Sequence, residues 1–169
     1  MARSSQAFFN ALDGDVEDER NEPNDFLRLL VSDLKELYWF EKNLLKIIAK
    51  MQKASSSKSL NILLADYLIE DNLNIERLEQ IFMFISEIPK ANKSNLYEEF
   101  LSDINDILMK TKYDDALRDD CFFCMLNKMD KFKTTCYEGV IALAIQIGND
   151  DMITLLEENK KSALQAKHY

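Results

Sequence analysis

Histidine is almost missing from this 169-residue chain, since His168, next to the C-terminus, is the only one. Glycine and proline are scarce as well, with three and two residues. So few turn-forming residues exclude a strand-rich fold, and the abundance of Leu, Ile, Met, Lys and acidic residues favours helices. The lack of histidine excludes a Ser- or Cys-based catalytic triad, and the scattered glycines form no phosphate-binding loop. The sequence therefore predicts an all-α protein that is not an enzyme.

The chain also lacks an excess of basic residues. Its formal net charge is −9 and its pI is about 4.7. Binding to nucleic acid or to an anionic membrane needs a basic face, so neither partner is expected. No apolar run approaches the roughly 20 residues that span a bilayer, and the N-terminus lacks the features of a signal peptide. With three cysteines, an odd number, we expect free thiols and a cytoplasmic location.

Differences in composition divide the sequence into two regions. Residues 1–24 contain most of an acidic stretch, Asp13 to Asp25, and are predicted to be a flexible acidic tail. Residues 25–167 are predicted to be one helical-bundle domain, since their length is enough to bury a single core. The acidic stretch is expected to be a solvated linker.

Apolar residues at 3-4 spacing predict five helices in the second region. Pro89 is expected to end the second helix and Gly148 the fourth. A connection of about eight residues after the second helix, if extended, could just cross a bundle about 25 Å long. That would give the one-crossover topology of ferritin-like folds. The predicted helices are 25–53, 59–88, 95–112, 115–147 and 150–167.

One position in the apolar seam of the first helix is charged. Glu41 lies midway between Leu37 and Leu44, so its spacing alone places the carboxylate in the core. A buried carboxylate is costly without a partner. It is therefore either a metal ligand or, as we prefer, the partner of a lysine on a facing helix, for which Lys133 and Lys128 are candidates.

Two stretches, Asp33 to Leu45 and Ile75 to Phe82, resemble the first helix pair of the YciE/YciF-type ferritin-like stress proteins of bacteria. The resemblance continues more weakly in the fourth helix, at Leu117-Arg118-Asp119, Tyr137 and Gln146-Ile147-Gly148. It implies a ferritin-like four-helix bundle with a short fifth C-terminal helix, dimerisation and accumulation in stress. It also implies, for many members, two metal ions held by carboxylates and histidines.

The resemblance assigns the metal ligands residue by residue. Such a site takes a Glu from each of two helices and Glu-x-x-His from each of the other two. Glu41 and Asp130 remain as residual metal positions, whereas the choice between Glu99 and Asp103 in the third helix stays open. The other ligand positions fall on residues unsuited to hard metal ions: Ile69, Asn72, Lys133, Ser162 and Ala163. We therefore expect no cofactor, with Fe or Mn bound by carboxylates alone as the alternative.

Cysteines and aromatic residues offer two further candidates. The Cys121-x-x-Cys124 motif is interpreted as a pair of buried core thiols, because apolar residues flank it and Cys136 lies about 18 Å along the helix from Cys124. The aromatic triplet Tyr38-Trp39-Phe40 spreads around its helix, so part of it lies off the seam. We expect it to form a dimer surface rather than to pack under the tail or the fifth helix.

These observations support three hypotheses. The first is a non-catalytic, ferritin-like protein with a degenerate di-metal site, acting as a stress-associated structural or interaction module and forming a homodimer. The second is a weak metal-binding or oxidase protein that uses Glu41, Asp130 and an acid of the third helix. The third is a helical adaptor that binds a protein through its acidic tail or its aromatic triplet. A contact of Glu41 with Lys133 or Lys128 would favour the first, and a polar cavity between Glu41 and Asp130 the second.

Overall fold

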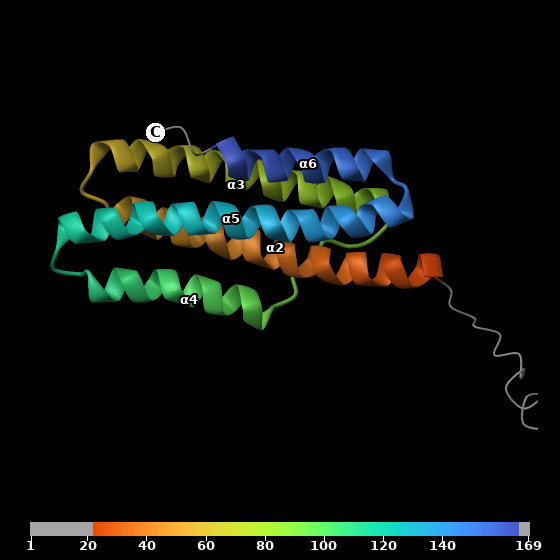
Figure 1. Ribbon diagram of the computed structural model, residues 1–169, viewed down its shortest axis with the longest axis horizontal. Coiled ribbons are helices and arrows are strands. Elements are labelled where there is room, and N and C mark those ends of the chain that lie inside the picture. Colours follow the sequence, from red (N-terminus) through yellow and green to blue (C-terminus); the bar gives the residue numbers. More distant parts are fainter. Residues whose placement is uncertain (1–21, 166–169) are drawn as a thin grey trace, which may run out of the picture.

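The protein consists of α-helices joined by short loops (Figure 1). The computed structural model describes the backbone of residues 22–165 and the side chains of residues 25–163, and this part contains no strand. The all-α prediction is confirmed, whereas most of the predicted acidic tail lies outside the described residues. In chain order the helices are α2 (Glu22–Ala54), α3 (Lys58–Phe84), α4 (Asn95–Lys110), α5 (Asp115–Ile147) and α6 (Asp150–Gln165).

Four of these helices form the bundle, and α4 lies outside it (Figure 1). Helix α2 packs against α3 and α5, and α6 packs against the same two helices. Helix α4 packs against α2 and α5. The C-terminal helix is short, as predicted, but it is one of the four bundle helices. The additional helix is α4.

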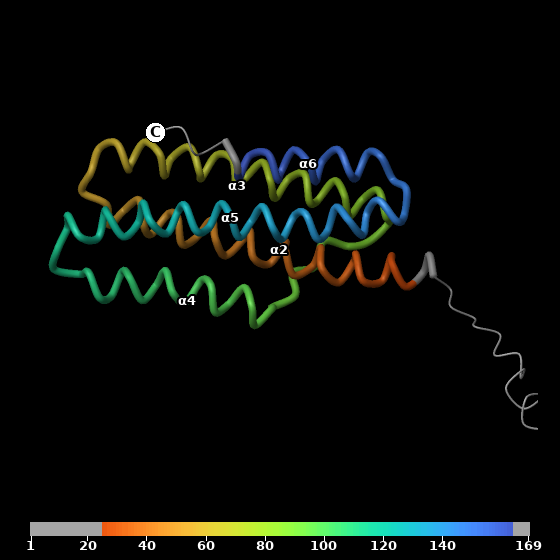
Figure 2. The backbone as a smooth tube through the Cα atoms, in the orientation of Figure 1, coloured from red at the N-terminus to blue at the C-terminus, as the bar shows by residue number. Residues whose placement is uncertain are grey.

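The link between α3 and α5 gives the bundle its topology. Figure 2 shows that α3 and α5 run in the same direction, so the chain returns along the bundle between them. The loop after α3 passes over α2, where the backbone N–H of Asn92 donates to the carbonyl of Lys35 at 3.0 Å. Helix α4 then covers the remaining length. The predicted crossover is present, but a helix makes it rather than an extended loop.

Two of the predicted helix ends are as expected and one is not. Helix α5 ends at Gly148, which has the left-handed conformation with φ 73°. The Asp114 side chain caps the N-terminus of α5 by accepting a hydrogen bond from the backbone N–H of Leu117. Helix α3, however, ends at Phe84 rather than at Pro89. Ser86 adopts a positive φ of 56° there and turns the chain before the proline is reached.

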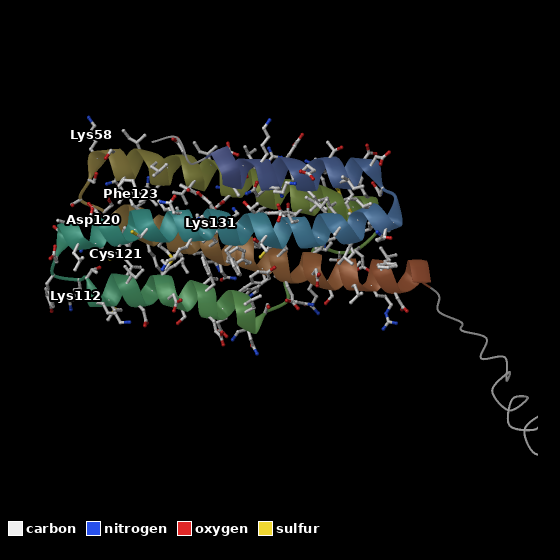
Figure 3. All side chains as sticks on the ribbon, viewed as in Figure 1. Lys58, Lys112, Asp120, Cys121, Phe123 and Lys131 are labelled. Carbon is white, nitrogen blue, oxygen red and sulfur yellow. The ribbon has the colours of Figure 1, made fainter. Side chains whose placement is uncertain are left out.

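The turn between α2 and α3 is fixed by a carboxylate from α5. Asp119 accepts hydrogen bonds from the backbone N–H of Ser57 at 2.7 Å and from the hydroxyl of Ser56 at 2.7 Å. Hydrogen bonds from Ser56 and Ser57 lower the pKa of Asp119 although burial opposes them. Figure 3 shows Lys58, at the start of α3, at the same end of the bundle as Asp120 of α5.

The number of faces that a helix buries depends on how many other helices it contacts. In α2 the predicted seam is confirmed, with Leu37, Glu41 and Leu44 all fully buried. Helices α2 and α5 also contact α4, so each buries a second face. In α5 the apolar residues Cys136 and Leu143 are only partly buried. The main seam of α5 is instead Phe122, Leu126, Met129, Lys133, Tyr137, Val140 and Ala144.

None of the helices among the described residues has the length and apolar character needed to cross a membrane.

Candidate functional site

A buried ion-pair triad lies at the centre of the bundle. The Lys133 ammonium of α5 donates to Asp71 Oδ1 of α3 at 2.6 Å and to Glu41 Oε2 of α2 at 3.0 Å. The side chains are 2%, 1% and 0% exposed respectively. One cation thus joins two carboxylates from facing helices, and it does so without contact with solvent.

The triad is part of a longer hydrogen-bond network. The Tyr137 hydroxyl of α5 donates to Glu41 Oε1 at 2.7 Å, and it accepts from the Asn159 amide of α6 at 3.2 Å. The same amide donates to the carbonyl of Asn74 in α3 at 3.1 Å. All four bundle helices therefore contribute polar groups to one fully buried network.

Asp130, one helical turn before Lys133, has a different partner. Its Oδ2 accepts from the Tyr67 hydroxyl of α3 at 2.8 Å, and the residue is 1% exposed. Glu41 instead contacts Lys133 and Tyr137. The structure therefore gives the two residual metal positions separate partners.

The electrostatics of the triad follow from burial and from charge. Burial raises the pKa of Glu41 to about 7, although Lys133 and the hydrogen bond from Tyr137 act in the opposite direction. For Lys133, burial alone would lower the pKa, but Asp71 and Glu41 outweigh it and hold the pKa above its usual value. The lysine thus stays charged, while burial favours the protonated form of Glu41.

The residues at the centre do not fit a di-metal site. A hard metal ion needs several oxygen or imidazole ligands facing one point. Here an ammonium already lies between the two carboxylates, and a second cation at that point would be repelled by it. Among residues 25–163 no group of three or more His, Cys, Asp or Glu is placed to hold a metal ion.

Asp71 is the residue that sequence reasoning missed. The resemblance placed the ligands of the second helix on Ile69 and Asn72, but both are exposed, Ile69 to 59%. The buried pair with the same i, i+3 spacing is Asp71 and Asn74. The polar residues of α3 that face the bundle centre therefore lie two residues further along than the predicted pair. The 3-4 spacing that identified Glu41 runs through Tyr67, Asp71, Asn74 and Leu78 and would have identified them.

The remaining predicted positions are placed as follows. Of the two candidate partners of Glu41, Lys133 is correct and Lys128 is exposed. Glu99 and Asp103 are exposed on α4, which lies outside the bundle, so neither reaches the centre. Ser162 and Ala163 of α6 lie beside the buried acids, at the wall of a cavity.

The aromatic triplet is not a surface cluster, and this prediction is wrong for two of its members. Tyr38 is 4% exposed and its hydroxyl donates to Glu79 at 2.6 Å. Phe40 is fully buried and packs on Tyr97 of α4 with ring centroids 4.8 Å apart. The physical reason differs for the two residues, since Tyr38 packs against Phe82 of α3 and Phe40 is covered by α4. Only Trp39 stays partly exposed.

The cysteines are free thiols, but they are not core residues. Cys124 is exposed, and Cys121 and Cys136 are partly buried. The interpretation of Cys121 and Cys124 as buried thiols is therefore wrong. Both lie in the first third of α5, and Figure 3 shows Cys121 near the start of that helix.

Comparison with known proteins agrees with this fold. Protein YciF of Escherichia coli strain K12 is 26% identical over 126 residues, which cover 74% of this chain and 75% of that protein. The structure resembles YcfI from Rhodopseudomonas palustris, with a TM-score of 0.79, and the E. coli stress protein YciF, with 0.77. Each is 22% identical and covers 83% of this chain and 89% of the other. A family model described as "Domain of unknown function (DUF892)" matches residues 25–168. The chain therefore belongs to the DUF892 family, as a YciF-type helical-bundle protein.

Proposed function

We propose that this protein is a non-catalytic, ferritin-like bundle with a degenerate di-metal site, in which the ammonium of Lys133 supplies the positive charge that metal ions would supply. The observation that carries the proposal is the placement of Lys133 between Glu41 and Asp71, at 3.0 Å and 2.6 Å. A buried ammonium neutralises facing carboxylates without depending on a supply of metal. The bundle then keeps its shape whether or not iron or manganese is available.

We further propose that the bundle acts as a structural or interaction module in the stress response. Its support comes from relatives: E. coli YciF is described as a stress protein, and YcfI of R. palustris has been assigned provisionally as a structural protein. Family resemblance also supports a homodimer and a cytoplasmic location. Sedimentation of the purified chain would test the dimer, because a monomer at micromolar concentration would contradict it.

The experiment for the metal-independent proposal is a titration of the purified protein with Fe²⁺, Mn²⁺ and Zn²⁺ while its melting temperature is followed. An ion bound only by the native state raises stability by about 2.7 kcal/mol at a hundredfold excess over Kd. We expect no shift for the wild type. The matched variant is Lys133→Ala, in which Glu41 and Asp71 lack their cation, and there we expect an ion to raise the melting temperature.

The alternative is a carboxylate site for iron or manganese that includes Glu41 and Asp130. It predicts a clear shift in the wild type that Glu41→Ala abolishes, and that result would overturn our proposal. A melting-temperature shift that remains in Glu41→Ala would show that the ion binds at a site that does not include Glu41. The adaptor alternative would gain if substitution of Trp39, the partly exposed member of the triplet, removed a bound protein partner.

A further inference from the structure

The outer face of α2 is basic, although the chain has a net charge of −9. Exposed lysines recur there at i, i+4, i+8 and i+11, so they form one stripe along the helix. The members of this lysine stripe are Lys42, Lys46, Lys50 and Lys53. None of them forms an ion pair with a described acid, and like charges at i, i+4 repel one another. An anionic partner would relieve that repulsion.

An aromatic residue and a groove adjoin the lysine stripe. Trp39, the only tryptophan of the chain, is partly exposed and lies about one turn before Lys42. A groove of about 330 Å³ lies between α2 and α4, and its lining includes Trp39, Lys46 and Lys50. Figure 1 shows α4 alongside this half of α2. The stripe therefore borders a surface on which a segment of chain can lie.

The same sequence contains an anionic segment of matching length. Residues 13–19 read Asp-Gly-Asp-Val-Glu-Asp-Glu, so acids occupy positions 13, 15, 17 and 19. In an extended chain alternate side chains face the same side, so these four carboxylates share one face about 20 Å long. The lysine stripe is about 16 Å long, because its ends are 11 residues apart on a helix. Four carboxylates can therefore face four ammonium groups.

This acidic segment, residues 13–19, cannot pair with the lysine stripe of its own copy. Helix α2 begins at Glu22, and Lys50 lies 28 residues further along it, about 42 Å away. Asp13 lies nine residues before Glu22, so the backbone extends at most about 32 Å from there to Asp13. The other three carboxylates are closer to Glu22 in sequence and reach less far. Pairing along the whole stripe therefore needs the segment of another copy.

Wider polyanions fit the stripe less well. Acids flank it on both sides, since Glu79 of α3 accepts from Tyr38, the residue that Lys42 contacts, and Glu98 of α4 lines the groove. A nucleic acid or an anionic membrane presents charge over a broader surface and would meet these acids. The net charge adds repulsion at longer range. A single extended segment can contact the lysines of one helix alone.

We propose that the acidic segment of one copy lies along the lysine stripe of a second copy, and that the two copies exchange their segments. Such an exchange uses the same contact twice, so it closes at the dimer. The contact presupposes the homodimer proposed above and specifies which surfaces associate. The DUF892 family model begins at residue 25, so the acidic segment is a feature of this chain outside the family domain.

The test is a charge exchange between two variants of the full chain, followed by sedimentation velocity. One variant reverses the stripe with Lys46→Glu and Lys50→Glu, and the other reverses the segment with Asp15→Lys and Glu17→Lys. Each variant alone brings like charges together, so we expect its Kd for dimerisation to rise at least about tenfold. An equimolar mixture has opposite charges at both contacts and should dimerise within about threefold of the wild-type Kd.

A matched control separates this contact from the effect of net charge. Lys128→Glu with Lys131→Glu reverses two exposed lysines on α5 and should leave the Kd unchanged. The two stripe lysines are exposed as well, so we expect the melting temperature of the stripe variant to equal that of the wild type. Trp39 gives a second readout, because its fluorescence should change when the wild type is diluted through its Kd and stay constant in the stripe variant.

Several results would overturn the proposal. A mixture that dimerises no better than either variant would show that the segment and the stripe do not meet. An equal rise of the Kd in the α5 control would show that net charge alone governs association. A dimer that persists unchanged in both variants would contradict this contact and leave the proposed homodimer standing. A wild type that is monomeric at every concentration would contradict both.

Discussion

Two residues that are adjacent in the chain, Phe40 and Glu41, belong to two different cores. Phe40 faces α4 and one side of α5, since its ring lies 4.8 Å from Tyr97 and 6.0 Å from Phe100 of α4 and 5.6 Å from Phe132 of α5. Glu41 faces the bundle centre, where it meets Lys133 and Tyr137. Both side chains are fully buried. The two sides of α2 therefore reach the same burial by different chemistry.

The two sides of α2 are therefore expected to tolerate substitutions differently. Contacts between aromatic rings are many and individually weak, so a substitution that keeps an apolar side chain of related size preserves most of them. The polar core has few contacts, and each group depends on one or two partners. Removal of one partner leaves another group buried and unsatisfied. The polar core is thus the more specific part of the fold and the less tolerant one.

The largest effect is expected for Lys133→Ala, which leaves Glu41 and Asp71 buried without their cation. We expect it to lower the free energy of unfolding by about 3–5 kcal/mol, as measured by urea denaturation at pH 7.5. Lys128→Ala, an exposed change on the same helix, is the control and should stay within about 0.5 kcal/mol. Equal effects of the two substitutions would mean that the triad contributes little.

The second-largest effect is expected in the pH dependence of the free energy of unfolding. The pKa of Glu41 is raised from 4.5 to about 7 by burial, so between these values the native state binds more protons than the unfolded chain. The contribution of Glu41 to stability therefore falls as pH rises from 4.5 to 7, by about 3 kcal/mol. The measurement is the difference in unfolding free energy between wild type and Glu41→Gln across this range. A difference that is flat, or that rises with pH, would contradict the raised pKa.

A single hydroxyl provides a finer test of the polar core. Tyr137→Phe removes the donor to Glu41 and the acceptor for Asn159 without changing the packing of the ring. We expect a loss of about 1–3 kcal/mol in thermal or urea unfolding. Tyr113→Phe, at a residue that is 91% exposed, should have no effect. Equal losses of stability in Tyr137→Phe and Tyr113→Phe would contradict the expectation that the buried hydroxyl contributes more than the exposed one.

The smallest effect is expected in the aromatic core. Phe40→Leu keeps an apolar side chain of related size, so neighbouring rings can adjust, and we expect a loss below about 1.5 kcal/mol. Phe84→Leu, at a half-exposed site, gives the baseline. A loss at Phe40 larger than that at Tyr137 would reverse the comparison, since the aromatic side would then be the less tolerant one.

Much of the site could be predicted wherever apolar residues marked the register. Glu41 was found because Leu37 and Leu44 flank it at regular spacing, and Lys133 was one of two candidates for its partner, with Lys128 as the other. Asp71, Asn74 and Asn159 were not found, because polar residues in the seam look like a solvent-facing stretch. In α3 the predicted ligand position fell on Ile69, although the 3-4 spacing through Tyr67, Asp71 and Asn74 follows the buried face of the helix.

The sequence by itself determined that the chain is helical, where its helices start and, to within a few residues, where they end. These properties depend on local propensity, on capping groups and on the period of apolar residues. Only the tertiary structure decided that α4 lies outside the bundle and covers Phe40, and that Tyr38 is buried against α3. It also decided that one lysine serves two carboxylates from different helices. Contacts between residues far apart in the chain leave no periodic trace in the sequence, because they depend on which helices become neighbours.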